Sequence, residues 1–170
     1  MDRIHCLVLR DIDNKDVRQF GPDEIDEGVQ LLAEAEEIIG HNIIDFDIPA
    51  IQLVYPDFKP SCTVTDTLVL SRLIKHELFA EDAERGFSID DFPKRMWGSH
   101  SLKAWGLRLY NFKDDYEGGW EEFSDEMMTY CVQDTHVTHT LYNHLMKTDP
   151  SEQSIYLEPV SYTHLRAHET

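Results

Sequence analysis

The stretch DEMMTYCVQDTHVTHTL, residues 125–141, predicts a long helix and places two polar side chains where apolar ones are expected. Ser124 is a natural N-cap for a helix over residues 125–146. The apolar positions of this helix form one stripe: Met127, Cys131, Leu141 and Leu145. Tyr130 and Asp134 lie one turn apart and interrupt that stripe.

A buried carboxylate must be paired or must hold a metal, because desolvating it alone costs several kcal/mol. Asp134 has no lysine or arginine at helical spacing. This absence favours a metal ion, or a second carboxylate across a shared site. The alternative is a satisfied core aspartate that bonds Tyr130 or a backbone amide.

Short strands and helices alternate along the rest of the chain. Residues 4–11 and 17–20 predict a hairpin, whose turn takes its Asp and Asn from residues 12–16. Further strands are expected near residues 37–42 and 62–66, and further helices within residues 21–38, 45–55, 67–74 and 99–110. Residues 76–98 lack clean periodicity and carry many acids, so we expect a long surface insertion there. This order predicts an α/β domain with a mixed sheet.

The composition and the charge of the chain limit the classes of function that it can have. The chain has 170 residues, 41% of them hydrophobic, which fits one domain, and no apolar run is long enough to span a membrane. A protein that binds duplex DNA along its backbone is normally basic, so the net charge of -18 argues against that class of protein. An excess of acidic residues has three interpretations: it keeps the protein soluble, it mimics DNA, or it supplies carboxylates that bind divalent metals. Cys6, Cys62 and Cys131 are far apart in the sequence, which favours reduced thiols over disulfides or a zinc site.

A second stretch, GHNIIDFDIPAI, spans residues 40–51. A strand ends near Asn42, and Phe46 and Asp47 follow just before a helix. Asp47 is therefore expected at the carboxyl edge of the sheet, where open α/β sheets place their sites. Taken alone, the stretch is more simply a loop with a turn-forming aspartate.

Together, the two stretches resemble motifs of DEDD-type 3′–5′ exonucleases. Asn42 followed by Phe46 and Asp47 matches N-x(2,3)-[FY]-D, and YCVQD matches Y-x(3)-D of the tyrosine variant. Three further strings, at residues 66–74, 98–109 and 124–134, look like the proofreading exonuclease domain of family-A replicative DNA polymerases of tailed phages. The resemblance covers residues 4–158.

This resemblance implies a DnaQ-like, ribonuclease-H-like fold, with a mixed sheet flanked by helices. It also implies that two Mg²⁺ or Mn²⁺ ions hydrolyse nucleotides from the 3′ end of single-stranded DNA. Asp134 would ligate the first ion, Asp47 would serve the second through water, and Tyr130 would orient the attacking water. Asn42 and Phe46 would shape the pocket for nucleic acid. The implied setting is a monomer beside the polymerase domain of the same parent chain, in the cytoplasm of an infected bacterium.

The family's first motif, D-x-E, is not found where the resemblance places it. We expect it to lie before Met1, so that residues 1–158 lack the first strand of the domain. Residues 159–170 are expected to be a non-native or disordered tail. An alternative source of ligands is Asp11 and Asp13, although DIDNKDV is typical of a hairpin turn. With two of four carboxylates, activity is expected to be absent or weak.

Three other functions are compatible with the same sequence. A superfamily exonuclease that trims RNA shares the two motifs. A catalytically dead, acidic module that binds nucleic acid or a protein partner could keep the same fold. A plain structural domain would use Asp134 as a satisfied core acid.

Overall fold

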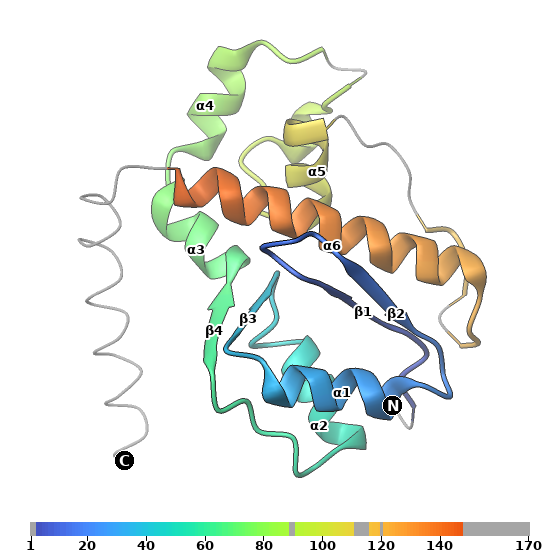
Figure 1. Ribbon diagram of the computed structural model, residues 1–170. Helices are drawn as coiled ribbons and strands as arrows, with labels where there is room; N and C mark the ends of the chain where they lie inside the picture. The colour runs from blue at the N-terminus through green and yellow to red at the C-terminus, as the bar shows by residue number, and fades with distance from the viewer. Residues whose placement is uncertain (1–2, 89–90, 111–115, 120, 148–170) are drawn as a thin grey trace.

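The computed structural model describes residues 3–88, 91–110, 116–119 and 121–147, in which short strands are flanked by helices (Figure 1). The strands are β1 (Leu7–Arg10), β2 (Val17–Phe20), β3 (Glu37–Gly40) and β4 (Thr63–Asp66). The helices are α1 (Ile25–Glu34), α2 (Asp47–Val54), α3 (Thr67–Ile74), α4 (Leu78–Arg85), the 3-10 turn η1 (Lys94–Met96), α5 (Leu102–Tyr110) and α6 (Asp125–Met146).

The hairpin predicted near the start of the chain is confirmed. Strands β1 and β2 are antiparallel, and their register pairs Leu7 with Phe20. The backbone N–H groups of Asp13 and Asn14 both donate to Asp11 Oδ1, at 2.9 Å. The Asp11 side chain is therefore engaged in the turn, which supports the turn interpretation of this segment over a ligand role.

Strands β3 and β4 form a parallel pair, in which Gly40 is level with Asp66. Both strands thus end at one edge, where the loop to α2 and the start of α3 lie side by side. In the described part of the chain, the antiparallel and parallel pairs form two separate two-stranded sheets. The predicted α/β class with antiparallel and parallel strands is confirmed, and this arrangement is compatible with a ribonuclease-H-like fold.

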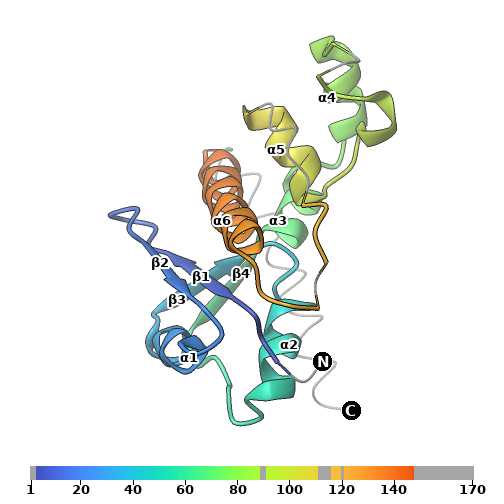
Figure 2. The same cartoon turned by 90° about the vertical axis from the view of Figure 1, so that its right-hand side faces the viewer.

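Helices cover the hairpin on two sides: α6 crosses one face and α1 lies on the other (Figures 1 and 2). Gly28 of α1 lies so close to the hairpin that an added Cβ would be 2.6 Å from Leu7 Cδ2. The helix can approach this closely because residue 28 has no side chain. Three of the four residues of the predicted apolar stripe of α6 are buried, with Met127 1% exposed and Leu141 and Leu145 fully buried, whereas Cys131 is half-buried.

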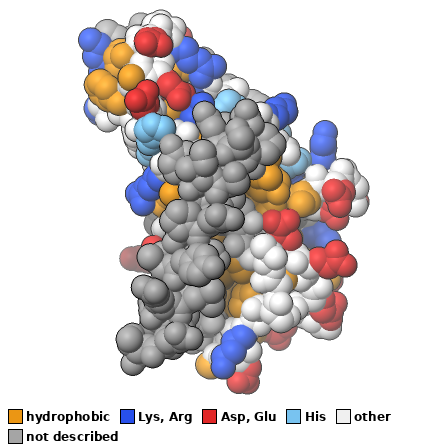
Figure 3. Space-filling view, turned by 90° about the vertical axis from the view of Figure 1, so that its left-hand side faces the viewer, with side chains coloured by type: hydrophobic (Ala, Val, Ile, Leu, Met, Phe, Trp, Pro, Cys, Tyr) orange, Lys and Arg blue, Asp and Glu red, His pale blue; other side chains and the backbone are white. Residues whose placement is uncertain are grey.

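The prediction of a long surface insertion at residues 76–98 is wrong. This segment contains α4 and η1, and Phe92 is fully buried against Ala104 and Leu107. The outer side of α4 is exposed, and acidic, basic and apolar side chains intermingle at that end of the molecule (Figure 3). The inner side carries Asp82, which is 1% exposed.

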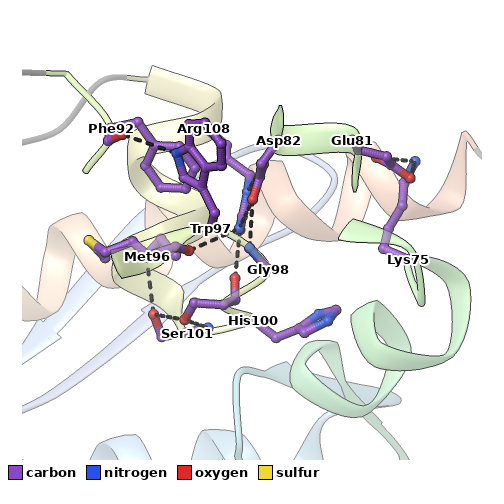
Figure 4. A network of polar contacts seen from close by, with 12 residues as sticks. Lys75, Glu81, Asp82, Phe92, Met96, Trp97, Gly98, His100, Ser101 and Arg108 are labelled. Carbon is purple, nitrogen blue, oxygen red and sulfur yellow. Dashed lines mark hydrogen bonds and ion pairs between the residues drawn. The ribbon is translucent and has the colours of Figure 1, made fainter. Parts of the chain in front are cut away.

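Asp82 binds the buried Arg108 of α5 through two hydrogen bonds of 2.8 Å (Figure 4). The same guanidinium donates to the carbonyl of Ser99 at 2.7 Å and lies over the rings of Trp105 and Phe92. A buried ion pair therefore links α4 to α5. An aspartate and an arginine 26 residues apart give no local signal of this burial.

No helix in the described ranges is long and apolar enough to cross a membrane. The expected tail, residues 159–170, lies outside the described residues.

Candidate functional site

Asp47 and Asp134 lie close enough for the charge of Asp47 to act on Asp134, and Asp47 follows the loop at the end of β3. Asp47 is the first residue of α2, and Asp134 lies in the middle of α6, which packs against β1 and β3. Partial burial raises the pKa of Asp134 to about 6, and the nearby charge of Asp47 adds to the effect. Asp47 keeps an open side toward solvent, but the protein atoms around it and the charge of Asp66 raise its pKa to about 6 as well.

This pair is not neutralised by the protein. In residues 3–88, 91–110, 116–119 and 121–147, neither carboxylate forms an ion pair with lysine or arginine. The raised pKa of Asp134 has two causes, desolvation and the like charge of Asp47. Two such oxygen ligands fit a hard divalent cation. They are few, however: the described chain has no cluster of three His, Cys, Asp or Glu side chains able to hold a metal.

A third aspartate, Asp66, holds the backbone of the site in place. Its carboxylate caps α3 by accepting from the N–H groups of Leu68 and Val69. It also accepts from the N–H groups of Asn42, at 2.9 Å, and Ile44, at 3.2 Å. Asp66 therefore fixes the loop that delivers Asp47, a function that sequence reasoning missed because the loop donors are more than 20 residues away.

Replacing Asp66 with alanine should lower the free energy of unfolding by about 2 kcal/mol, because four backbone N–H groups lose their acceptor. Urea denaturation measures this change. Asp57→Ala, at an exposed carboxylate between α2 and β4, serves as the control and should change stability by less than about 0.5 kcal/mol. Equal effects of the two substitutions would show that Asp66 does not hold the loop.

Two of the remaining predicted site residues, Tyr130 and Asn42, line different cavities. Tyr130 is one turn before Asp134, its ring centroid is 5.9 Å from that of Tyr116, and it lines a cavity of about 900 Å³. Phe46 precedes Asp47 and is 58% exposed. Asn42 has a left-handed backbone, with φ of 61°, a conformation that Asn adopts more readily than most residues. It lines a separate cavity of about 550 Å³ together with His41, Arg72 and His100.

The raised pKa values of Asp47 and Asp134 predict an unusual dependence of stability on pH. Both values, about 6, lie above the ordinary 3.8, so the folded chain holds more protons than the unfolded chain between about pH 4 and 6. Stability from these groups is thus fully present below pH 4 and is lost as pH rises through 6. Relative to an Asp47→Asn, Asp134→Asn double variant, the wild type should lose stability over this range.

Urea denaturation of both proteins at a series of pH values measures this difference. Asp45→Asn, which removes an exposed carboxylate of the same loop, is the control and should follow the wild type. A constant difference between wild type and double variant from pH 4 to 7 would contradict the shifted values.

Comparison with known proteins identifies relatives of this chain by sequence. The chain is 32% identical over 173 residues to the DNA-directed DNA polymerase of Escherichia phage T7, a match that covers 85% of this chain and 24% of that protein. It is 31% identical over 172 residues to the DNA-directed DNA polymerase of Enterobacteria phage T3, with the same coverage. No family model matches the sequence. The chain spans about a quarter of the length of these relatives, and it is homologous to that part of the phage DNA-directed DNA polymerases.

Proposed function

We propose that this chain is the 3′–5′ proofreading exonuclease domain of a family-A phage DNA polymerase, which removes nucleotides from the 3′ end of single-stranded DNA. The observation that carries the proposal is the pair of unneutralised carboxylates, Asp47 and Asp134, which lie near each other at one edge of the sheet and both have a raised pKa. Homology to DNA polymerases supports the choice of DNA as substrate.

Each predicted residue then has a defined contribution. Asp134 would hold one divalent ion, and Asp47 would serve a second through water. When bound, Mg²⁺ or Mn²⁺ would supply the activation of a water and the stabilisation of the leaving oxygen of the scissile phosphodiester. Tyr130 orients that water from the turn before Asp134. The exposed ring of Phe46 offers a stacking surface for a base, and Asn42 borders the neighbouring cavity.

The acidic charge of the chain is compatible with this substrate. A proofreading site needs a few unpaired nucleotides at a 3′ end, so stacking and metal contacts can replace a basic surface. The polymerase domain of the same parent chain would hold the duplex. Because two carboxylates leave most of the coordination of Mg²⁺ to other ligands, we expect the isolated chain to be inactive or weak.

The test is Mn²⁺-dependent shortening of a 5′-labelled single-stranded DNA oligonucleotide and of its RNA counterpart. It compares the chain alone with a version extended at its N-terminus by a strand that carries a D-x-E pair. The proposal expects stepwise loss of nucleotides from the 3′ end of DNA by the extended form. Faster shortening of RNA would favour an RNA exonuclease. Tight binding without cleavage by a folded, extended form would favour a binding module.

A further inference from the structure

Two cysteines far apart in the sequence lie side by side next to the carboxylate pair. Cys6 directly precedes β1, Cys131 lies on α6, and their Sγ atoms are 3.2 Å apart. Both side chains are half-buried and both thiols are free. The charges of Asp134 and Asp47 reach Cys131, which places this thiol near the candidate site.

We propose that Cys6 and Cys131 form a site of reversible thiol oxidation, in which a low-molecular-weight disulfide converts the thiol pair into an intramolecular disulfide. This proposal does not depend on the proposed exonuclease activity, because it concerns only the contact between β1 and α6.

The geometry favours closure of this bond. A disulfide has an S–S length of about 2.05 Å, so the two sulfur atoms need to approach each other by about 1.2 Å. Cys6 lies outside the β1–β2 ladder, whose first pair is Leu7 with Phe20, so its backbone is not fixed by strand pairing. A small shift at residue 6 can therefore bring the sulfur atoms together without breaking the hairpin.

The two thiols differ in reactivity. The contact with Cys131 lowers the pKa of Cys6, whereas the same contact and partial burial raise the pKa of Cys131. Since the thiolate is the nucleophile, Cys6 is the sulfur that attacks first and Cys131 is the one that resolves.

The exchange balances in two steps. The Cys6 thiolate attacks one sulfur of the small disulfide, forms a mixed disulfide and releases one small thiolate, which takes up a proton. Cys131 then loses its proton to solvent and attacks the Cys6 sulfur, which forms the Cys6–Cys131 bond and releases the second small thiol. The protein pair loses two electrons and two protons, and the small disulfide gains them.

The new bond would join the start of β1 to the turn of α6 between Tyr130 and Asp134. It would close a loop of more than 100 residues. Because such a loop restricts the conformations of the unfolded chain, the bond is expected to increase the stability of the folded chain. Oxidation should therefore raise the midpoint of thermal unfolding by roughly 5–10 °C.

The experiment treats the full chain with excess oxidised glutathione, blocks the remaining thiols and digests the protein with trypsin. The expected product links the peptide of residues 4–10 to that of residues 114–147, and dithiothreitol separates them. Cys62 is the matched control, because it is also a half-buried cysteine that directly precedes a strand, β4. Cys62→Ser should keep the linked peptides and the rise in unfolding temperature, whereas Cys6→Ser and Cys131→Ser should lose both.

Other products would overturn the proposal. A glutathione adduct that persists on Cys6 in wild type and in Cys62→Ser, without linked peptides, would show that Cys131 does not resolve it. Linkage through Cys62, or disulfides between two chains only, would show that another pair reacts. These outcomes are read from proteins that retain Cys6 and Cys131, so they do not depend on whether those two variants fold.

Discussion

Replacing Arg108 with alanine is expected to lower the free energy of unfolding by about 3–5 kcal/mol. The substitution leaves the Asp82 carboxylate buried, and among the described residues it keeps only the hydrogen bond from the N–H of Gly98. It also removes the donor to the carbonyl of Ser99 and the cation that lies over Trp105 and Phe92. Much of the cost comes from the uncompensated charge rather than from the strength of the pair itself.

Two comparisons isolate that cause in urea denaturation. A double variant, Asp82→Leu with Arg108→Met, removes both charges and should recover a large part of the loss. The exposed pair Arg18–Glu27 provides the matched control, and Arg18→Ala should cost less than about 1 kcal/mol. An Arg108→Ala variant no less stable than Arg18→Ala would show that the buried pair does not hold α4 against α5.

Replacing Asp134 with asparagine should reduce the metal-dependent nuclease activity of the extended chain on the order of 10³-fold, because groups that act as a unit fail together. Asparagine keeps the shape of the side chain and removes the charge, so the fold is expected to remain intact. Asp47→Asn should also reduce activity, by a smaller factor, since its contact with the second ion is expected to pass through water.

The control for this series is Asp45→Asn, which removes an exposed carboxylate two residues from Asp47 and should leave the rate within about twofold. The rate is measured as 3′-terminal nucleotide released per unit time at saturating Mn²⁺. An Asp134→Asn variant that is folded and as active as Asp45→Asn would exclude Asp134 as a metal ligand.

Local patterns predicted the elements that local interactions define. The observed α6 spans Asp125–Met146, the predicted range, because a serine cap and an apolar stripe at helical spacing agree with each other. The hairpin was equally predictable from its turn residues. Residues 76–98 were not, because the burial of Asp82 depends on an arginine in another helix. A sequence pattern assigns charged residues to the surface when the partners that would allow their burial are distant in the sequence.

The candidate site also has a part that local patterns predict and a part that they do not. Its residues could be named from two short motifs, and the structure places Asp47 near Asp134 through the packing of α6 on the strands. Two contacts could not be predicted: the hydrogen bond from the Asn42 N–H to Asp66, and the contact between the sulfur atoms of Cys6 and Cys131. Both are tertiary contacts between single side chains, and no periodic pattern marks them.

If Asp47 and Asp134 form a site for divalent cations, paramagnetic broadening of amide NMR signals by traces of Mn²⁺ locates the bound ions at these two residues. Recorded near pH 7 and at about 0.15 M salt, which screens the acidic surface, the spectra report where the ion resides even when binding is weak. We expect signals around Asp47 and along α6 near Asp134 to broaden first, and to be spared in the Asp47→Asn, Asp134→Asn double variant. Broadening spread over the acidic surface, or unchanged in the double variant, would show that Asp47 and Asp134 do not form a cation site.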